Sequence, residues 1–190
     1  MKKLLNEELN RKTVEEFKKA GKYPLMIVLD DVRSLNNIGS VFRTCDAFLV
    51  EGIFLCGITG TPPHREISKT ALGATEWVHW QYFESTLNAI QELRKQEYRI
   101  YAVEQTVHSS ALHNFPVHNG QKYALVFGHE IRGVKQEVVD LCDGAIEIPQ
   151  HGTKHSLNIA VSAGIVIWEF FRRYQLQAKK AGNNQASDSI

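Results

Sequence analysis

Short apolar runs of strand length alternate with helix-like segments along most of this chain. The strand-like runs cover residues 26–32, 52–58, 77–83, 99–104, 123–128 and 145–149, and the helical segments cover residues 40–50, 85–98, 134–142 and 156–180. The first run opens with four consecutive apolar residues, which indicates a strand buried on both faces of a sheet. Because parallel neighbours need long crossover connections, the alternation predicts an α/β fold with a largely parallel sheet flanked by helices.

The chain has 190 residues, a length that suits one domain. We expect a folded domain over residues 25–175, a short basic extension over residues 1–24 and a polar, disordered tail over residues 176–190. The net charge of +1 divides unevenly, with +3 on residues 1–24 and +2 on residues 169–190, so that the centre carries −4. Basic ends permit a polyanionic partner, although they are also common solubilising features.

The cysteines and the hydropathy pattern indicate a cytoplasmic protein. The three cysteines are odd in number and form no C-x-x-C pair, which favours a reducing compartment. The first residues contain no apolar region of signal-peptide length. The most apolar stretch, residues 159–171, is too short to span a bilayer and is interrupted by polar residues. No membrane association is therefore expected.

Several familiar site patterns are missing. No G-x-G-x-x-G follows the first strand, which disfavours a dinucleotide-binding oxidoreductase. The segment 128–135 differs from a phosphate-binding loop because Val134 precedes the lysine. His151 and His155 have the spacing of paired metal ligands, but a glycine lies between them and no third ligand is evident. We therefore expect no metal site.

Three polar clusters each follow or surround the end of a predicted strand. They cover residues 29–48, 124–134 and 146–164. In open α/β sheets, ligands bind outside the carboxyl ends of the strands, so these clusters are expected to meet at one site. In the first cluster, Asn36 and Asn37 suit a turn and a helix N-cap, and in the third the helix is expected to be capped near Ser156. Each cluster alone would also be an ordinary turn or cap.

Taken in order, the clusters carry three motifs. The first, N-x-x-x-x-x-R, falls on Asn37 and Arg43; the second, G-x-E-x-x-G, on Gly128, Glu130 and Gly133; the third, I-P-x-x-G-x-x-x-S-L-N, on Ile148, Pro149, Gly152, Ser156, Leu157 and Asn158. Together they resemble the SpoU (TrmH-like) family of RNA ribose 2′-O-methyltransferases, members of the SPOUT superfamily, over residues 24–172. The chain departs from the family at His129, where Asn is common, at Ile131, where Gly is frequent, and at Gln150, where Met is usual.

The resemblance implies a C-terminal trefoil knot that binds S-adenosylmethionine, and an active site formed across a homodimer interface. The residues expected to bind the cofactor are Glu104, Gln105, Gly128, Ile148, Ser156 and Leu157, with Gly128 letting the ligand approach the main chain. The expected catalytic residues are Arg43, Asn37, Glu130, Ser156 and Asn158. The expected RNA-binding residues are Lys12, Lys18, Lys19, Arg172 and Arg173. Short basic extensions favour tRNA over rRNA as the substrate, with a guanosine as the modified nucleotide. The alternative from a different class of proteins is a non-catalytic RNA-binding protein with the same fold.

The last helix is apolar or small on nearly every side in its first half. This pattern predicts either a central core helix or a helix packed between its own sheet and a second subunit. Small residues at 160 and 162–164 would let a second backbone approach closely.

The resemblance also raises the question of where the hydroxyl proton goes. An arginine pKa of about 12.5–13.8 makes deprotonation at pH 7 cost roughly 7–9 kcal/mol. We therefore hypothesise that Arg43 mainly grips the phosphate beside the target ribose, and that Asn37 fixes Arg43 or the ribose. Glu130 would either anchor its loop or contact the substrate directly.

Overall fold

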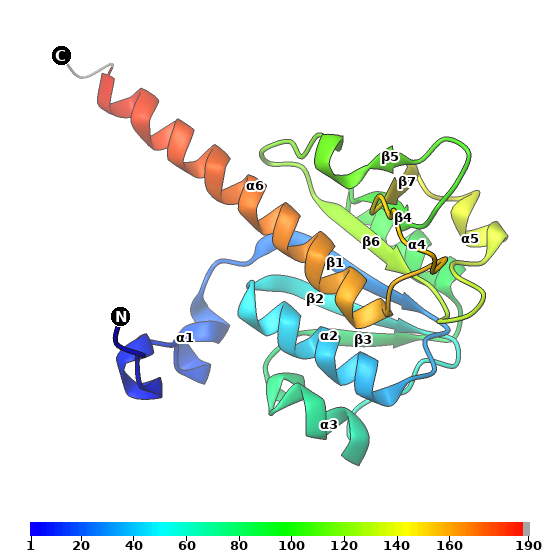
Figure 1. Cartoon of the computed structure of the whole chain (residues 1–190), viewed down its shortest axis with the longest axis horizontal. Coiled ribbons are helices and arrows are strands. Elements are labelled where there is room, and N and C mark those ends of the chain that lie inside the picture. Colours follow the sequence, from blue (N-terminus) through cyan, green and yellow to red (C-terminus); the bar gives the residue numbers. More distant parts are fainter. Residues whose placement is uncertain (188–190) are drawn as a thin grey trace.

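The computed structural model describes residues 1–187, except for the side chains of residues 6 and 180–187, and within them the chain forms one parallel sheet (Figure 1). The strands are β1 (Tyr23–Asp30), β2 (Val50–Cys56), β3 (Trp80–Phe83), β4 (Arg99–Val103), β5 (Ser110–Ala111), β6 (Tyr123–Phe127) and β7 (Gly144–Glu147). Their order in the sheet is β3-β2-β1-β6-β4-β7-β5, and every pairing is parallel. The α/β fold and all six predicted strands are thus confirmed, while the two-residue β5 was missed.

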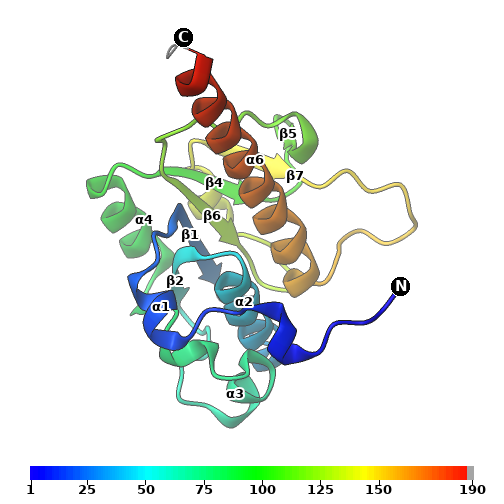
Figure 2. The ribbon, with the colours of Figure 1, turned by 90° about the vertical axis from the view of Figure 1, so that its left-hand side faces the viewer.

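The helices cover both faces of the sheet. They are α1 (Val14–Lys19), α2 (Leu35–Ala47), α3 (Arg65–Ala71), α4 (Thr86–Lys95), α5 (Gln136–Val139) and α6 (Ile159–Ser187), with 3-10 turns at Asn6–Leu9, Ala74–Glu76 and Leu112–Asn114. Alternate residues of the buried strands point to opposite sides, so Ile27 and Leu29 pack with α2, α3 and α6, whereas Met26 and Val28 pack with α4. Figure 2 shows α2 and α6 side by side over one face.

The helix α6 has one buried and one exposed side. Its buried residues, which include Ala163, Ile167 and Phe170, belong to the core of this chain, while Val161 and Trp168 are about half exposed, at 50% and 49%. The expectation of a helix surrounded by its own chain is therefore wrong. The exposed side is apolar, as the alternative of a second subunit requires, but the small residue Ala163 faces inward.

The final helix also runs further than expected. It continues to Ser187, so residues 176–187 are helical rather than disordered, and residues 188–190 lie outside the described part. Beyond its packed turns the sequence QLQAKKA contains good helix formers and no proline, so the backbone can remain helical after leaving the sheet. The trefoil knot implied by the resemblance stays a prediction.

The N-terminal extension is fixed to the domain at one point. In α1, Phe17 is buried in the core, and the ammonium group of Lys22 lies 3.8 Å from the centre of its ring. The strand β1 already begins at Tyr23, two residues before the expected domain boundary. Among the described helices, none is long and apolar enough to cross a membrane.

Candidate functional site

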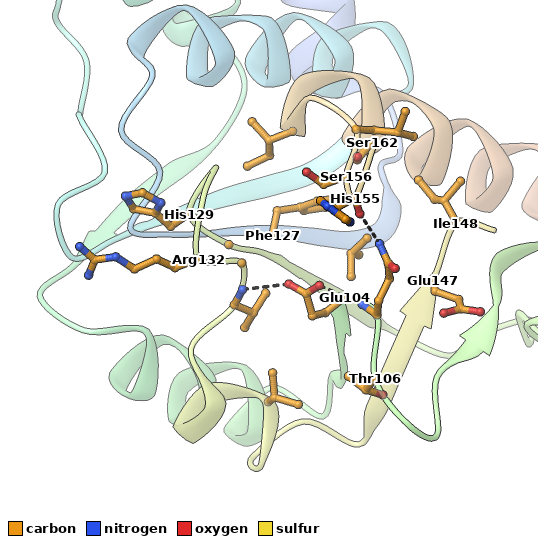
Figure 3. Close-up of a pocket in the computed structure, with 18 of the residues that line it drawn as sticks. Glu104, Thr106, Phe127, His129, Arg132, Glu147, Ile148, His155, Ser156 and Ser162 are labelled. Carbon is orange, nitrogen blue, oxygen red and sulfur yellow. Dashed lines mark hydrogen bonds between the residues drawn. The ribbon is translucent and has the colours of Figure 1, made fainter. Parts of the chain in front are cut away.

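A pocket of about 1200 Å³ opens at the carboxyl ends of β4, β6 and β7, next to the start of α6 (Figure 3). It is lined by residues 103–108 after β4, by most of residues 127–139 after β6, and by residues 146–162 around the loop that leads into α6, although not every residue of these ranges takes part. The second and third polar clusters of the sequence therefore meet at one site, as predicted. No residue of the first cluster lines the pocket, but Asn37 is hydrogen-bonded to the lining residues Glu130 and Asn158.

Eight of the ten predicted catalytic and cofactor-binding residues line the pocket. They are Glu104, Gln105, Gly128, Glu130, Ile148, Ser156, Leu157 and Asn158. The other two, Asn37 and Arg43, do not line it. Sequence reasoning also missed several lining residues, among them Thr106, Phe127, Glu147, His155 and Ser162. Of these, Phe127 had a usable signal, because it is the last apolar residue of a buried strand.

Glu104 and Gln105 connect the three lining segments. The carboxylate of Glu104 accepts hydrogen bonds from the backbone N–H of Val134, at 3.1 Å, and of Gln105, at 2.9 Å. The side-chain amide of Gln105 donates to the carbonyl oxygen of His155 at 2.8 Å. Two of these contacts, Val134 to Glu104 and Gln105 to His155, appear as dashed lines in Figure 3. The residues predicted to touch the cofactor thus also hold the pocket walls together.

The second motif forms a tight loop whose two glycines are required by neighbouring atoms. His129 and Gly133 exchange backbone hydrogen bonds of 3.0 and 2.8 Å. A Cβ at Gly128 would lie 2.1 Å from the carbonyl carbon of Gly133 and from the nitrogen of Val134. Gly133 has a φ of +67°, and a Cβ there would meet the Glu104 carboxylate at 2.1 Å. Gly128 therefore makes room for its own loop, and because it also lines the pocket, its expected contact with a ligand stays a prediction.

Glu130 joins this loop to the start of α2. Its carboxylate accepts from the backbone N–H groups of Ser34, at 2.9 Å, and Arg33, at 3.1 Å, and from the side-chain amide of Asn37 at 3.3 Å. Burial acts to raise the pKa of Glu130, but the N–H groups of Ser34, Glu130 itself and Arg33 outweigh it and hold the pKa below its usual value. This geometry favours the anchoring role of Glu130 over direct substrate contact.

The lowered pKa of Glu130 predicts a specific pH dependence. A carboxylate with a lower pKa in the folded state stabilises the protein above the unfolded value of about 4.3, and this contribution is lost as the pH falls through the folded pKa. Replacing Glu130 with Gln should destabilise the protein by about 1–2 kcal/mol near pH 6, and the difference should shrink towards about pH 3. Urea unfolding of both proteins over this range measures it. A difference that is independent of pH would show that the charge of Glu130 does not hold the loop.

Two expected helix caps are corrected by the structure. The N-cap of α2 is Ser34, whose hydroxyl accepts from the backbone N–H of Asn37, so the helix starts earlier than Asn36. In α6 the cap is Asn158 rather than Ser156, because the Asn158 side chain accepts from the backbone N–H of Ala160 at 2.9 Å. The Asn158 amide also donates to the side-chain oxygen of Asn37 at 3.2 Å. Asn37 thus links Glu130 and Asn158 and orders the rim of the pocket.

Arg43 does not line the pocket of its own chain, although the cluster of residues 29–48 that contains it was expected to meet the other two clusters there. Six helical positions from Asn37 correspond to about 9 Å along the axis and about 240° of rotation, so the two side chains leave α2 in different directions. Arg43 is exposed, and no hydrogen bond or ion pair joins it to the part of the chain that the structure describes.

The basic residues expected to bind RNA differ in their availability. Lys12, Lys18 and Lys19 are exposed around α1. Arg172 and Arg173 both contact Glu169 on their own helix, and Arg173 also donates to the carbonyl oxygen of His113 at 2.8 Å. The guanidinium of Arg173 therefore attaches α6 to the segment after β5. RNA contacts at all five positions stay a prediction.

The described residues offer little support for a metal site or for a nucleophilic cysteine. In them, no three His, Cys, Asp or Glu side chains are grouped to hold a metal ion. Burial raises the pKa of the Cys56 and Cys142 thiols to about 12, and raises that of Cys45 as well. Thiols with such pKa values stay protonated at neutral pH and are poor nucleophiles.

The known proteins that resemble this chain in sequence and structure have names that describe RNA-modifying enzymes. The model of the SpoU rRNA Methylase family matches residues 24–168. The chain is 30% identical over 175 residues to the tRNA (guanosine(18)-2′-O)-methyltransferase of Thermus thermophilus, covering 92% of this chain and 86% of that protein. It is also 30% identical over 158 residues to the 23S rRNA (guanosine-2′-O-)-methyltransferase RlmB of Neisseria meningitidis, covering 83% of this chain and 62% of that protein.

Two solved structures share the fold. The TrmH/SpoU tRNA modifying enzyme of A. aeolicus has a TM-score of 0.77 at 25% identity, over 87% of this chain and 82% of that one. The AdoMet-bound rRNA methyltransferase of Sinorhizobium meliloti has a TM-score of 0.74 at 25% identity, over 83% of this chain and 60% of that one. This chain thus spans most of the first protein and well under two thirds of the second.

Proposed function

The chain belongs to the SpoU rRNA Methylase family, and on that premise we propose that it transfers a methyl group from S-adenosylmethionine to a ribose 2′-hydroxyl of RNA. The resemblance found in the three sequence motifs is thereby confirmed. The observation that carries the proposal is the convergence of motifs two and three on one pocket, with motif one attached to its rim through Glu130 and Asn158.

The pocket has the chemistry that this cofactor needs. Its size exceeds the usual range of about 300–1000 Å³ for small-ligand sites, which leaves room for a nucleotide at the mouth. Phe127, Ile148 and Leu157 provide apolar surface for an adenine ring, and the carboxylates of Glu104 and Glu147 complement a cationic ligand. Bound there, S-adenosylmethionine would supply an activated methyl group and leave as a neutral thioether.

Arg43 must then act on the pocket of a second copy of this chain. Arg43 lies outside its own pocket, while α6, which packs beside α2, has an exposed apolar side. In such a dimer, Arg43 of one copy would hold the phosphate next to the target ribose and orient the hydroxyl towards the methyl group. The proton would leave through that phosphate or a water, which avoids the cost of deprotonating arginine.

A charge on the exposed side of α6 should therefore abolish both the dimer and the activity. Replacing Val161 with Glu is expected to give monomers by light scattering and to lower methyl transfer by at least about 100-fold, since burying an unpaired carboxylate costs several kcal/mol. The matched control is Leu141→Glu, at an exposed leucine just after α5 that should change neither property. An active monomer would contradict the proposed dimer.

Within this reaction we propose tRNA as the substrate and a guanosine as the modified nucleotide. The tRNA assignment is supported by the Thermus relative, which is a tRNA (guanosine(18)-2′-O)-methyltransferase by name and matches 92% of this chain. The exposed Lys12, Lys18 and Lys19 would contact tRNA phosphates outside the pocket. The same reaction on rRNA is the alternative.

One experiment tests both levels of the proposal. The purified protein is incubated with methyl-labelled cofactor and total RNA from a strain that lacks it, and the RNA is then fractionated. We expect label in tRNA that survives alkali as a dinucleotide, because a methylated 2′-oxygen can no longer attack the neighbouring phosphate. Label only in rRNA would overturn the tRNA assignment. Absence of both transfer and calorimetric cofactor binding would favour a non-catalytic RNA-binding protein.

A further inference from the structure

Three side chains at the tip of the loop between Gly128 and Gly133 have no role in the site described so far. We propose that this tip, residues 129–132, holds the RNA strand at the pocket mouth, with His129 and Arg132 donating hydrogen bonds to a backbone phosphate and Ile131 packing against the adjacent nucleoside. The inference rests on the proposed function, because it assigns contacts to the RNA substrate of the same pocket.

Hydrogen bonds hold the backbone of the loop that carries the tip in place. His129 and Gly133 are joined by two backbone hydrogen bonds, Glu130 is bound to the start of α2, and Val134 is bound to Glu104. The loop is thus attached at its base, at its middle and at its end. Side chains on such a loop bind without first ordering their backbone, which reduces the entropic cost of association.

The Nε2 atom of His129, which faces away from the loop, is held as a hydrogen-bond donor. Its Nδ1 accepts a hydrogen bond from the backbone N–H of Ile131 at 3.0 Å. In a neutral imidazole whose Nδ1 is an acceptor, the proton must lie on Nε2. Figure 3 shows this ring on the same side of the loop as Arg132, with both directed away from Glu104 and Phe127. His129 therefore offers an Nε2–H group on the same side of the loop as Arg132.

The positive charge of Arg132 has no counterion in the described part of the chain. Arg132 is exposed and forms no ion pair there. Two acidic side chains of this region are already engaged. Glu130 accepts from the start of α2, and Asp31 accepts from the ammonium group of Lys135 at 2.6 Å and from the backbone N–H of Ile58 at 3.0 Å. The tip is therefore a place where an anion gains attraction without displacing an internal partner.

The exposed side chain of Ile131 and the structure of ribose indicate that the anion bound at the tip is a phosphate of the RNA backbone. Ile131 is 85% exposed although it lines the rim of the pocket, so it offers apolar surface next to the two donors. In RNA, the 2′-oxygen and the 3′-phosphate are on neighbouring carbons of one sugar. A ribose that places its 2′-oxygen in this pocket therefore brings a phosphate to the rim. The phosphate would match the two hydrogen-bond donors, His129 and Arg132, and the adjacent nucleoside would match the apolar side chain of Ile131.

Four variants test the tip. They are Arg132→Ala, His129→Asn, Ile131→Ala and, as a control, Lys95→Ala, which removes an exposed cation at the end of α4, shortly before the start of β4 and thus away from the carboxyl ends of the strands. Binding of unfractionated tRNA is measured from about 50 to 200 mM salt, with cofactor Kd by calorimetry and steady-state kcat and KM. Arg132→Ala should weaken RNA binding about tenfold and reduce the slope of log K against log salt by about 1.

The His129→Asn variant separates the two roles of the histidine. An asparagine oxygen can also accept from the N–H two residues later, so the loop keeps its shape, while the amide N–H of the shorter side chain no longer reaches the position of the histidine Nε2–H. We expect KM for RNA to rise several-fold for His129→Asn and for Ile131→Ala, with cofactor Kd within twofold of the wild type. Lys95→Ala should match the wild type in every measurement.

Three results would overturn the inference. Arg132→Ala could show the RNA affinity and salt slope of Lys95→Ala, or His129→Asn could have an unchanged KM, which would leave the histidine as a loop cap only. A parallel loss of cofactor and RNA affinity would show that the tip acts through the pocket rather than on RNA. If the wild type binds and methylates RNA while the variants do not differ from it, the tip assignment fails and the proposed function stands.

Discussion

Replacing Arg43 with alanine is expected to lower methyl transfer by about 100- to 1000-fold and to leave cofactor affinity within twofold of the wild type. The loss follows because a misplaced substrate hydroxyl costs about 100-fold or more in rate. Cofactor binding should persist because Arg43 does not line the pocket, and folding should persist because its side chain is exposed. Single-turnover transfer, calorimetry and thermal unfolding measure the three quantities. A parallel loss of cofactor binding would contradict a role for Arg43 that is limited to the RNA.

The lysine variant distinguishes two roles for this side chain. A guanidinium grips a phosphate through two parallel hydrogen bonds, which an ammonium group cannot reproduce. Arg43→Lys should therefore keep well under about a tenth of wild-type activity. Retention of about a tenth or more would count against the bidentate grip.

Replacing Gly128 with alanine is expected to abolish cofactor binding. The new Cβ would lie 2.1 Å from two backbone atoms of Gly133 and Val134, and backbone cannot yield as a flexible side chain does. The loop must then move, which breaks the Val134 bond to Glu104 and distorts the His129–Gly133 pair. We expect cofactor Kd to rise by at least about 100-fold and the free energy of unfolding to fall by about 1–3 kcal/mol.

The matched control is Gly152→Ala, in the loop before α6. A Cβ there meets nothing within 4 Å, so it should change neither stability nor cofactor affinity. Normal cofactor binding by Gly128→Ala would show that the loop does not form the pocket wall.

Mixing the two damaged proteins tests the dimer directly. Arg43→Ala keeps an intact pocket, and Gly128→Ala keeps an intact Arg43. If each site is built from two copies, a mixed dimer contains one complete site. After random exchange of subunits, half the dimers are mixed and each has one working site of two, so the mixture should regain about a quarter of wild-type activity. No recovery after demonstrated exchange would show that Arg43 acts within its own chain.

Local sequence patterns were sufficient to predict six of the seven strands, but not the short strand β5 or every helix. The buried strands were predictable because runs such as residues 123–128 are apolar throughout, and α4 was predictable because Ile90 and Leu93 form one face behind the cap Ser85. The helix α3 was missed because it has only seven residues, of which Ile67 and Ala71 alone are buried. Two contacts in two turns leave too weak a periodicity to read.

The α/β fold, the three motifs and most of the pocket could be predicted from the order of the amino acids, because strand burial and motif spacing are properties of neighbouring residues. The contacts that those residues make with one another are visible only in the three-dimensional structure. It showed that Gly128 makes room for Gly133 and that Glu130 binds the start of α2. It also showed that Arg43 lies outside its own pocket. These facts depend on atoms that are far apart in the chain and meet only when the strands are in register, so no local pattern contains them.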